Sequence, residues 1–255
     1  MSESIIVVEE KDSYAIIRMN RHAKRNAMNL EAREGMLAAF DQIKDRFSVV
    51  VLTGAETSFC AGIDLKEEGI RIEQGLPSDP ATSWAAVNLA IRKHPAVFIA
   101  AVNGIALGGG TTLINMCDLA IASEQASMGM PEMSFAIYPG LAGPCTQHTL
   151  TRKRAAQMIL TAKRIDGVTA ERWGLVNEVV SHDKLMETAE QWALDVSQFN
   201  AIALTEGKRA LDDIPNSIDW AAAFQYGEDK IDSIRARTEA ATAGIDNFAK
   251  GERSA

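Results

Sequence analysis

Two glycine-containing turns in this sequence could present backbone donors to a reacting oxygen. One turn holds Gly62 and Ile63, and the other is the triple glycine Gly108–Gly110, which lies between two apolar segments. A strand that ends at glycines and opens a helix leaves N–H groups unpaired at the positive helix end. If the two strands are neighbours, the N–H groups of Ile63 and Gly109 can converge as an oxyanion hole. Alternatively, the glycines only permit tight turns and close packing.

Glu132 is the candidate acid or base. It follows Pro131, a position that suits the first turn of a short helix. The neighbours Met130 and Phe135 are apolar, so the carboxylate is expected to be partly desolvated and able to act as a general base. Alternatively, the carboxylate only complements the helix dipole, and its apolar neighbours belong to the core.

Other kinds of chemistry lack their sequence signals. The chain has no Gly-x-Ser-x-Gly elbow, no Walker loop and no complete Gly-x-Gly-x-x-Gly fingerprint. Serine acyl transfer, phosphoryl transfer and hydride transfer therefore lose support. The three cysteines are widely spaced and the four histidines have no metal-ligand spacing, so no metal site is expected.

Composition indicates a reduced cytoplasmic protein. The 255 residues are 47% hydrophobic and 24% charged, which is ordinary for a soluble globular chain. A net charge of −8 argues against nucleic acid as the main partner. No apolar run reaches membrane-spanning length and no secretory signal is evident, so no membrane partner is expected. The basic residues Lys24, Arg25 and Lys66 are candidates for contacting ligand phosphates.

The order of the predicted elements indicates an α/β fold. Strands and helices alternate early in the chain, which favours parallel strands, and the later part is helical. A core domain over residues 1–198 and a helical C-terminal module over 199–255 are therefore expected. Strands are expected over residues 5–8, 14–19, 49–54, 96–102 and 119–122. Helices are expected over 29–47, 84–93, 152–160, 169–173, 183–199, 201–211 and 218–248, with a mobile loop over 69–82 and a rigid turn over 138–144.

Segments in order along nearly the whole chain resemble the crotonase superfamily, the enoyl-CoA hydratase/isomerase group. They are residues 24–28, 59–66, 103–104 with 106–110, 117–122, 131–132, 139–140 and 173–180. The resemblance implies a crotonase-like (ClpP/crotonase) spiral of ββα units with a C-terminal helical trimerisation region. It also implies a homotrimer or a dimer of trimers.

The same resemblance implies an acyl-CoA thioester as the ligand, with coenzyme A entering as part of the substrate and no separate cofactor. The thioester oxygen would lie between the N–H groups of Ile63 and Gly109, with Glu132 as the catalytic residue. The implied coenzyme A contacts are Lys24, Ala27, Lys66, Phe248 and Lys250. The implied pocket residues are Thr112, Met130, Phe135, Gly140 and Tyr226.

The sequence departs from the family hydratases at Thr112. Those hydratases carry one glutamate in the helix after the glycines and a second after the proline that Pro131 matches, and here only Glu132 is present. One carboxylate can still remove a proton α to a thioester and return it elsewhere, so double-bond isomerisation of an enoyl-CoA is the first expectation.

Three alternatives to isomerisation stay open. Hydration is one, and hydroxycinnamoyl-CoA hydratase-lyase chemistry is another. Such lyases have a small hydroxyl residue where Thr112 stands and a tyrosine in the helix that here contains Trp220 and Tyr226. Phe135 and Tyr138 would then line an aromatic pocket, although both can be core residues. The third alternative is a degenerate acyl-CoA-binding or oligomeric interaction protein.

Overall fold

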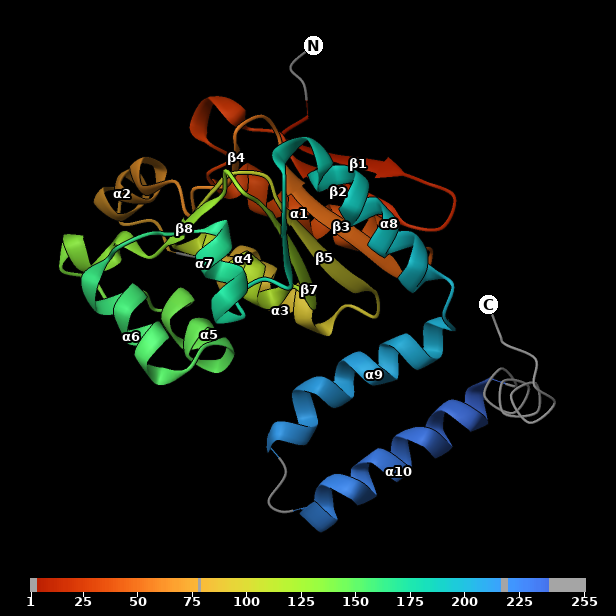
Figure 1. Cartoon of the computed structure of the whole chain (residues 1–255). Coiled ribbons are helices and arrows are strands. Elements are labelled where there is room, and N and C mark those ends of the chain that lie inside the picture. The colour runs from red at the N-terminus through yellow and green to blue at the C-terminus, as the bar shows by residue number, and fades with distance from the viewer. Residues whose placement is uncertain (1–3, 78, 217–219, 239–255) are drawn as a thin grey trace.

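Two sheets organise the molecule (Figure 1). The computed structural model describes residues 4–77, 79–216 and 220–238. Within them, the larger sheet has the strand order β1 (Ile6–Glu10), β2 (Ala15–Met19), β3 (Val49–Gly54), β5 (Val97–Val102), β7 (Leu119–Ser123) and β10 (Glu178–Val180). The smaller sheet has the order β4 (Ser58–Cys60), β6 (Ile105–Leu107), β8 (Ser127–Gly129) and β9 (Ile165–Asp166).

The parallel pairing expected from the alternation of strands and helices occurs in the larger sheet. β1 and β2 form an antiparallel pair, and the strands from β2 to β10 in the larger sheet pair in parallel. All residues of β3 and β5 are buried, which explains their continuous apolar sequences, because helices cover both faces of such a sheet. Val50 and Leu52 belong to one core cluster, and Val49 and Val51 to another on the opposite face.

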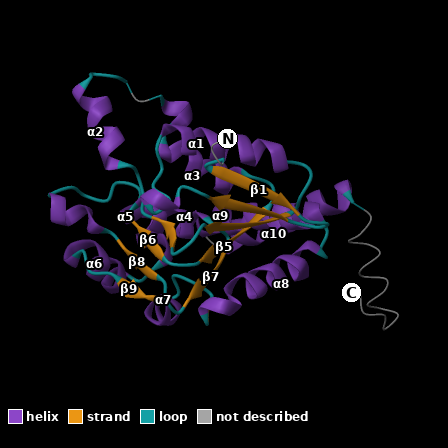
Figure 2. Cartoon of the chain, turned by 90° about the horizontal axis from the view of Figure 1, so that it is seen from above, coloured by secondary structure: helices purple, strands orange, loops and turns teal. Residues whose placement is uncertain are grey.

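Helices form the outer layers of the larger sheet. α8 lies on one face of the sheet and α1 and α3 on the other (Figure 2). The helices of the described residues are α1 (Leu30–Ile43), α2 (Leu65–Glu73), α3 (Trp84–Lys93), α4 (Gly109–Met116), α5 (Ala142–Thr149), α6 (Arg152–Thr161), α7 (Gly167–Trp173), α8 (Leu185–Ser197), α9 (Ala201–Asp213) and α10 (Trp220–Arg237).

Two local expectations are wrong. Residues 69–82 are not one loop, because α2 extends to Glu73 and begins with an N-terminal cap in which the Asp64 side chain accepts from the Lys66 and Glu67 N–H groups. The expected rigid turn over 138–144 ends within α5, which begins at Ala142. α3 has the expected bounds, and the other expected helices up to residue 211 occur with shifted ends. Of the helix expected over 218–248, α10 covers Trp220–Arg237, and residues 218–219 and 239–248 lie outside the described residues.

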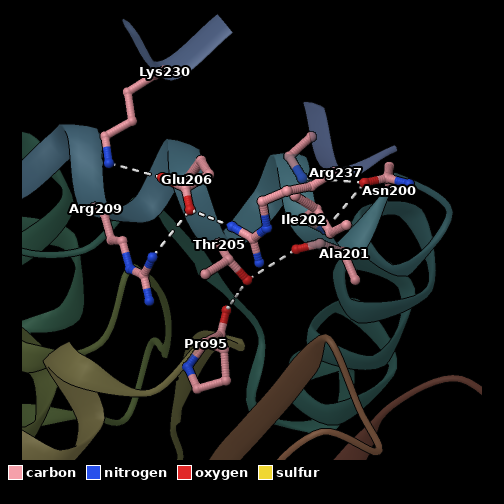
Figure 3. A network of polar contacts seen from close by, with 10 residues as sticks. Pro95, Asn200, Ala201, Ile202, Thr205, Glu206, Arg209, Lys230 and Arg237 are labelled. Carbon is pink, nitrogen blue, oxygen red and sulfur yellow. Dashed lines mark hydrogen bonds and ion pairs between the residues drawn. The ribbon is translucent and has the colours of Figure 1, made fainter. Parts of the chain in front are cut away.

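α9 and α10 form a C-terminal helical hairpin that extends from the sheets (Figure 1). The Glu206 carboxylate joins the two helices, as Figure 3 shows. It accepts hydrogen bonds from Lys230 Nζ at 2.7 Å and Arg237 Nη1 at 2.7 Å on α10, and from Arg209 Nη1 at 3.0 Å on α9. The division of the chain at residue 198 stays a prediction.

Replacing Glu206 with glutamine is expected to loosen this hairpin. The Glu206 side chain is only 3% exposed and faces three cations, so the neutral amide leaves their charges uncompensated. Amide hydrogen exchange in α10 is expected to accelerate relative to α8. The control is Glu187→Gln, which removes an exposed α8 carboxylate paired with Lys184. Equal α10 exchange in both variants would contradict the expectation.

Acid is expected to loosen the same hairpin. The hydrogen bond from Lys230 is the main cause that lowers the pKa of Glu206. A carboxylate with a lowered pKa in the folded state stabilises the fold above its unfolded pKa and loses that contribution as pH falls through the lowered value. The protection factors of α10 amides, which are exchange rates corrected for the intrinsic pH dependence of exchange, should therefore fall in the wild type towards acid pH.

None of the helices in the described ranges is both long and apolar enough to cross a bilayer.

Candidate active site

The two glycine turns lie side by side in the structure. β4 leads into the first turn and β6 into the second, and these strands pair in parallel. A Cβ added at Gly62 would lie 2.7 Å from the Leu107 carbonyl oxygen and 3.0 Å from the Gly109 nitrogen. Gly62 also has a φ of +89°, which favours glycine. The small sheet thus brings the backbone next to Ile63 against the start of α4.

Both proposed donor groups are unpaired within the described part of the chain. Gly109 is the first residue of α4, so its N–H has no acceptor in the helix. The Ile63 turn is held by its neighbours: Met28 N–H donates to Gly62 O at 2.8 Å, and Asp64 N–H donates to Met28 O at 3.1 Å. These bonds fix the backbone around Ile63 without using its own N–H.

Glu132 lies against the same turn. It belongs to the 3₁₀ helix η3 (Pro131–Phe135), and a Cβ added at Gly108 would collide with Glu132 Oε1. Gly108 has a φ of +51°, which side-chain-bearing residues rarely adopt, and a side chain there would require the Glu132 carboxylate to move. Glu132 Oε2 is buried and has no hydrogen-bond partner among the described residues.

Burial raises the pKa of Glu132 above its ordinary value, because desolvation disfavours the charged form. A hydrogen bond from the Glu132 backbone opposes this effect, and no second carboxylate contributes to the shift within the described chain. The site therefore holds a partly desolvated carboxylate with one free oxygen. Such a group can take a proton from a bound ligand and return it.

Thr112 and Met130 lie in the interior beside these groups. Thr112 is 1% exposed, and its Oγ1 donates to Gly108 O at 3.3 Å. The Met130 side chain is fully buried, and its Sδ accepts from Thr146 Oγ1 at 3.8 Å. The Thr112 hydroxyl is thus hydrogen-bonded to the start of its own helix. Residue 112 provides no carboxylate beside Glu132.

The places of the other expected pocket residues in a ligand pocket stay predictions, and Phe135 belongs to the same 3₁₀ helix as Glu132. Phe135 is 58% exposed, Tyr138 is 51% exposed, and Gly140 is also exposed. Phe135 and Tyr138 are therefore not core residues within this chain. Tyr226 lies on α10, where its hydroxyl donates to Asp213, and its expected place in the pocket stays a prediction.

The expected coenzyme A contacts lie on segments that meet near Ile63. Lys24 is exposed at the end of a 3₁₀ helix, and Lys66 is exposed in the first turn of α2. Arg21 joins the two segments, since its Nη1 donates to Ala27 O at 3.1 Å and to Asp64 Oδ2 at 2.7 Å. Phe248 and Lys250 lie outside the described residues.

Sequence reasoning missed one group beside these turns, the indole of Trp84. The sequence placed Trp84 only at the start of a helix, whereas in the structure its Nε1 lies 2.5 Å from where a Cβ on Gly109 would be. This contact depends on how α3 packs against α4. No local sequence signal reports such packing.

The arrangement of two sheets, buried parallel strands and adjacent glycine turns is the crotonase fold, as the sequence predicts. A family model for enoyl-CoA hydratase/isomerase matches residues 9–246. The chain belongs to this family and is a crotonase-type enzyme.

Named relatives and solved structures agree with this assignment. The chain is 38% identical over 220 residues to a probable enoyl-CoA hydratase of Rhizobium meliloti, covering 83% of this chain and 82% of the relative. It is 34% identical over 232 residues to the short-chain-enoyl-CoA hydratase of Clostridium acetobutylicum, covering 88% of each. The crystal structure of an enoyl-CoA hydratase from Bacillus anthracis is 30% identical, covers 98% of each chain and has a TM-score of 0.88.

Proposed function

We propose that this protein isomerises the double bond of an enoyl-CoA through a thioester enolate, with Glu132 as the only general acid/base. One observation carries the proposal: Glu132 is a partly desolvated carboxylate that meets the Gly108 turn, and no second carboxylate among the described residues contributes to its pKa. The acyl-CoA thioester is the substrate class, and coenzyme A arrives as part of it.

The proposed reaction is a proton transfer within the substrate. Glu132 takes a proton from C2 of a 3-enoyl thioester, and the electron pair of that C–H bond delocalises into the thioester and the alkene. The N–H groups of Ile63 and Gly109 donate to the resulting enolate oxygen. The protonated Glu132 then returns the proton to C4, which leaves the 2-enoyl thioester and restores the carboxylate.

Hydration needs more than this site offers. A water molecule must lose one proton and C2 must gain another, and two carboxylates can divide these tasks. Here Thr112 stands at the position of the first carboxylate, and its hydroxyl already donates to Gly108 O. The geometry therefore supports isomerisation better than efficient hydration.

Hydration remains the second candidate because several relatives are named enoyl-CoA hydratases. A hydratase-lyase reaction would use the same enolate.

Incubation of the wild type with 3-enoyl and 2-enoyl thioesters separates these reactions. Isomerisation leaves the mass unchanged and moves the double bond, whereas hydration adds one water. Failure of calorimetry to detect any acyl-CoA binding would favour an interaction protein and contradict the proposed function.

Replacing Thr112 with glutamate is expected to raise crotonyl-CoA hydration at least about tenfold, since general acid–base groups typically contribute 10²–10⁴-fold. Rates of hydration and isomerisation are measured on the same preparation. Thr112→Gln is the matched control, because it has similar volume without the charge. Equal hydration by both variants would show that a missing carboxylate does not limit the reaction.

The assembly and location are also part of this proposal. We propose a homotrimer or dimer of trimers built through the C-terminal helices, acting in the cytoplasm, with coenzyme A bound near Lys24, Ala27 and Lys66. Lys24 and Lys66 are both exposed near the Ile63 turn, which supports the ligand placement. Sedimentation of the full chain measures the assembly.

A further inference from the structure

The Trp84 side chain carries a buried donor that the proposed mechanism does not use. Trp84 is the first residue of α3 and is 3% exposed. Its Nε1 has no hydrogen-bond partner within the described residues. A buried N–H without an acceptor loses its hydration without compensation, so such groups are rare and call for a partner.

The position of Nε1 points to the place where the two glycine turns meet. A Cβ added at Gly109 would lie 2.5 Å from Trp84 Nε1 and 3.2 Å from the Gly62 Cα. The indole N–H is therefore beside the backbone that presents the Gly109 N–H. A side chain at position 109 would displace the indole. Glycine at this position therefore permits both the turn and the close packing of Trp84 against it.

The chemistry of the indole restricts what it can do there. Its N–H donates hydrogen bonds and accepts none, and it does not exchange protons at neutral pH. Two unpaired acceptors occur nearby in sequence or space, Asn88 Oδ1 on the same helix and Glu132 Oε2, but neither accepts from Trp84. Within the described chain the indole thus lacks an acceptor, and a bound ligand can supply one.

We propose that Trp84 Nε1–H is a third hydrogen-bond donor to the thioester carbonyl oxygen, beside the N–H groups of Ile63 and Gly109. This inference rests on the proposed function, which places that oxygen between the two turns. The third donor stabilises the negative charge that develops on the oxygen when Glu132 removes the C2 proton. Trp84 is then a catalytic residue and α3 is part of the active site.

Trp84→Phe tests the proposal, because it removes the N–H and keeps most of the aromatic ring. Loss of one oxyanion donor typically lowers kcat 10²–10³-fold, so a fall of about 10²-fold is expected with little change in KM. The matched control is Trp192→Phe on α8, which packs in the core cluster on the opposite face of the larger sheet. Equal kinetics for the two variants would overturn the proposal.

A spectroscopic measurement separates hydrogen bonding from structural support. A 4-dimethylaminocinnamoyl-CoA thioester absorbs at longer wavelength when donors polarise its carbonyl group. The red shift on binding is expected to be smaller with Trp84→Phe than with wild type or Trp192→Phe. An unchanged red shift in Trp84→Phe would overturn the third donor. Absence of binding or of a red shift in the wild type would instead contradict the proposed function.

The wild-type protein provides a test that does not depend on the folding of Trp84→Phe. The chain has four tryptophans, so phenylalanine replacements at Trp173, Trp192 and Trp220 assign the Trp84 indole resonance by elimination. Binding of the thioester is expected to move the Trp84 indole proton downfield, as a new hydrogen bond deshields it. A Trp84 resonance that stays in place while the thioester binds would overturn the proposal.

Discussion

Replacing Glu132 with glutamine is expected to lower kcat about 10²- to 10⁴-fold, the usual contribution of a general acid–base group. Glutamine has the shape of glutamate but cannot take a proton from C2. The Glu132 carboxylate lies against Gly108 and has a free, buried Oε2, so the substitution changes protonation with little change in volume. Acyl-CoA binding, measured by calorimetry, should persist.

The pH dependence provides a second readout of Glu132. Burial raises its pKa above the ordinary value of 4.5, and the base is active only when deprotonated. The wild-type kcat/KM is therefore expected to rise with pH through a value above that of an exposed glutamate. This limb should be absent from any residual activity of Glu132→Gln. The control is Glu187→Gln on the exposed face of α8; turnover of Glu132→Gln equal to this control would refute the single-base mechanism.

Replacing Lys208 with methionine is expected to lower the free energy of unfolding by about 3–5 kcal/mol, the usual cost of breaking a buried ion pair. The Lys208 side chain is 4% exposed and its Nζ lies 2.9 Å from Asp118 Oδ2. Nζ also donates to Ile91 O and Ala96 O, each at 2.8 Å. Lys208 thus joins α9 to the end of α3 and the start of β5.

Methionine keeps the length of the lysine side chain but leaves Asp118 with less compensation. Asp118 Oδ2 still accepts from Phe98 N–H, and Arg92 Nη1 remains 3.8 Å from Oδ1. Combining Lys208→Met with Asp118→Asn should therefore recover part of the loss. Denaturant unfolding measures both variants against Lys184→Met, which removes an exposed cation. A loss no larger than that of the control would show that Lys208 does not anchor α9.

Much of the sheet was predictable because its strands are continuous apolar runs. β3 has the predicted bounds, and both β3 and β5 end where Gly54 or Asn103-Gly104 interrupts the apolar sequence. The cap at Asn29 was predictable for the same local reason, since its side chain accepts from Ala32 N–H. These features depend on residues close together in the chain.

α2 was not predictable by the same reasoning. Gly69, Gly75, Pro77 and Pro80 indicate a loop, and α2 has no buried residue that would give an apolar stripe. The helix is instead supported by the Asp64 cap and the ion pair between Glu68 and Arg71, whose charged atoms are 2.6 Å apart. Such polar support does not require a buried apolar face.

The candidate site was partly predictable. The sequence identified Ile63, Gly109 and Glu132, and the structure brings their segments together, although their catalytic roles stay predictions. Trp84 was missed because its placement depends on a contact between two helices that sequence spacing does not report. Strand pairing can be anticipated from buried apolar runs, but the direction of one side-chain nitrogen cannot.

The pairing of β4 with β6 has a consequence for how the proposed donors become ordered. Because this pairing and the Met28 hydrogen bonds fix the backbone near Ile63 and Gly109, the entropy of positioning those donors is lost during folding and not during ligand binding. The site is therefore preorganised. A substitution that weakens the fold at a distance, such as Lys208→Met, should reduce the fraction of active molecules while each folded molecule keeps its turnover.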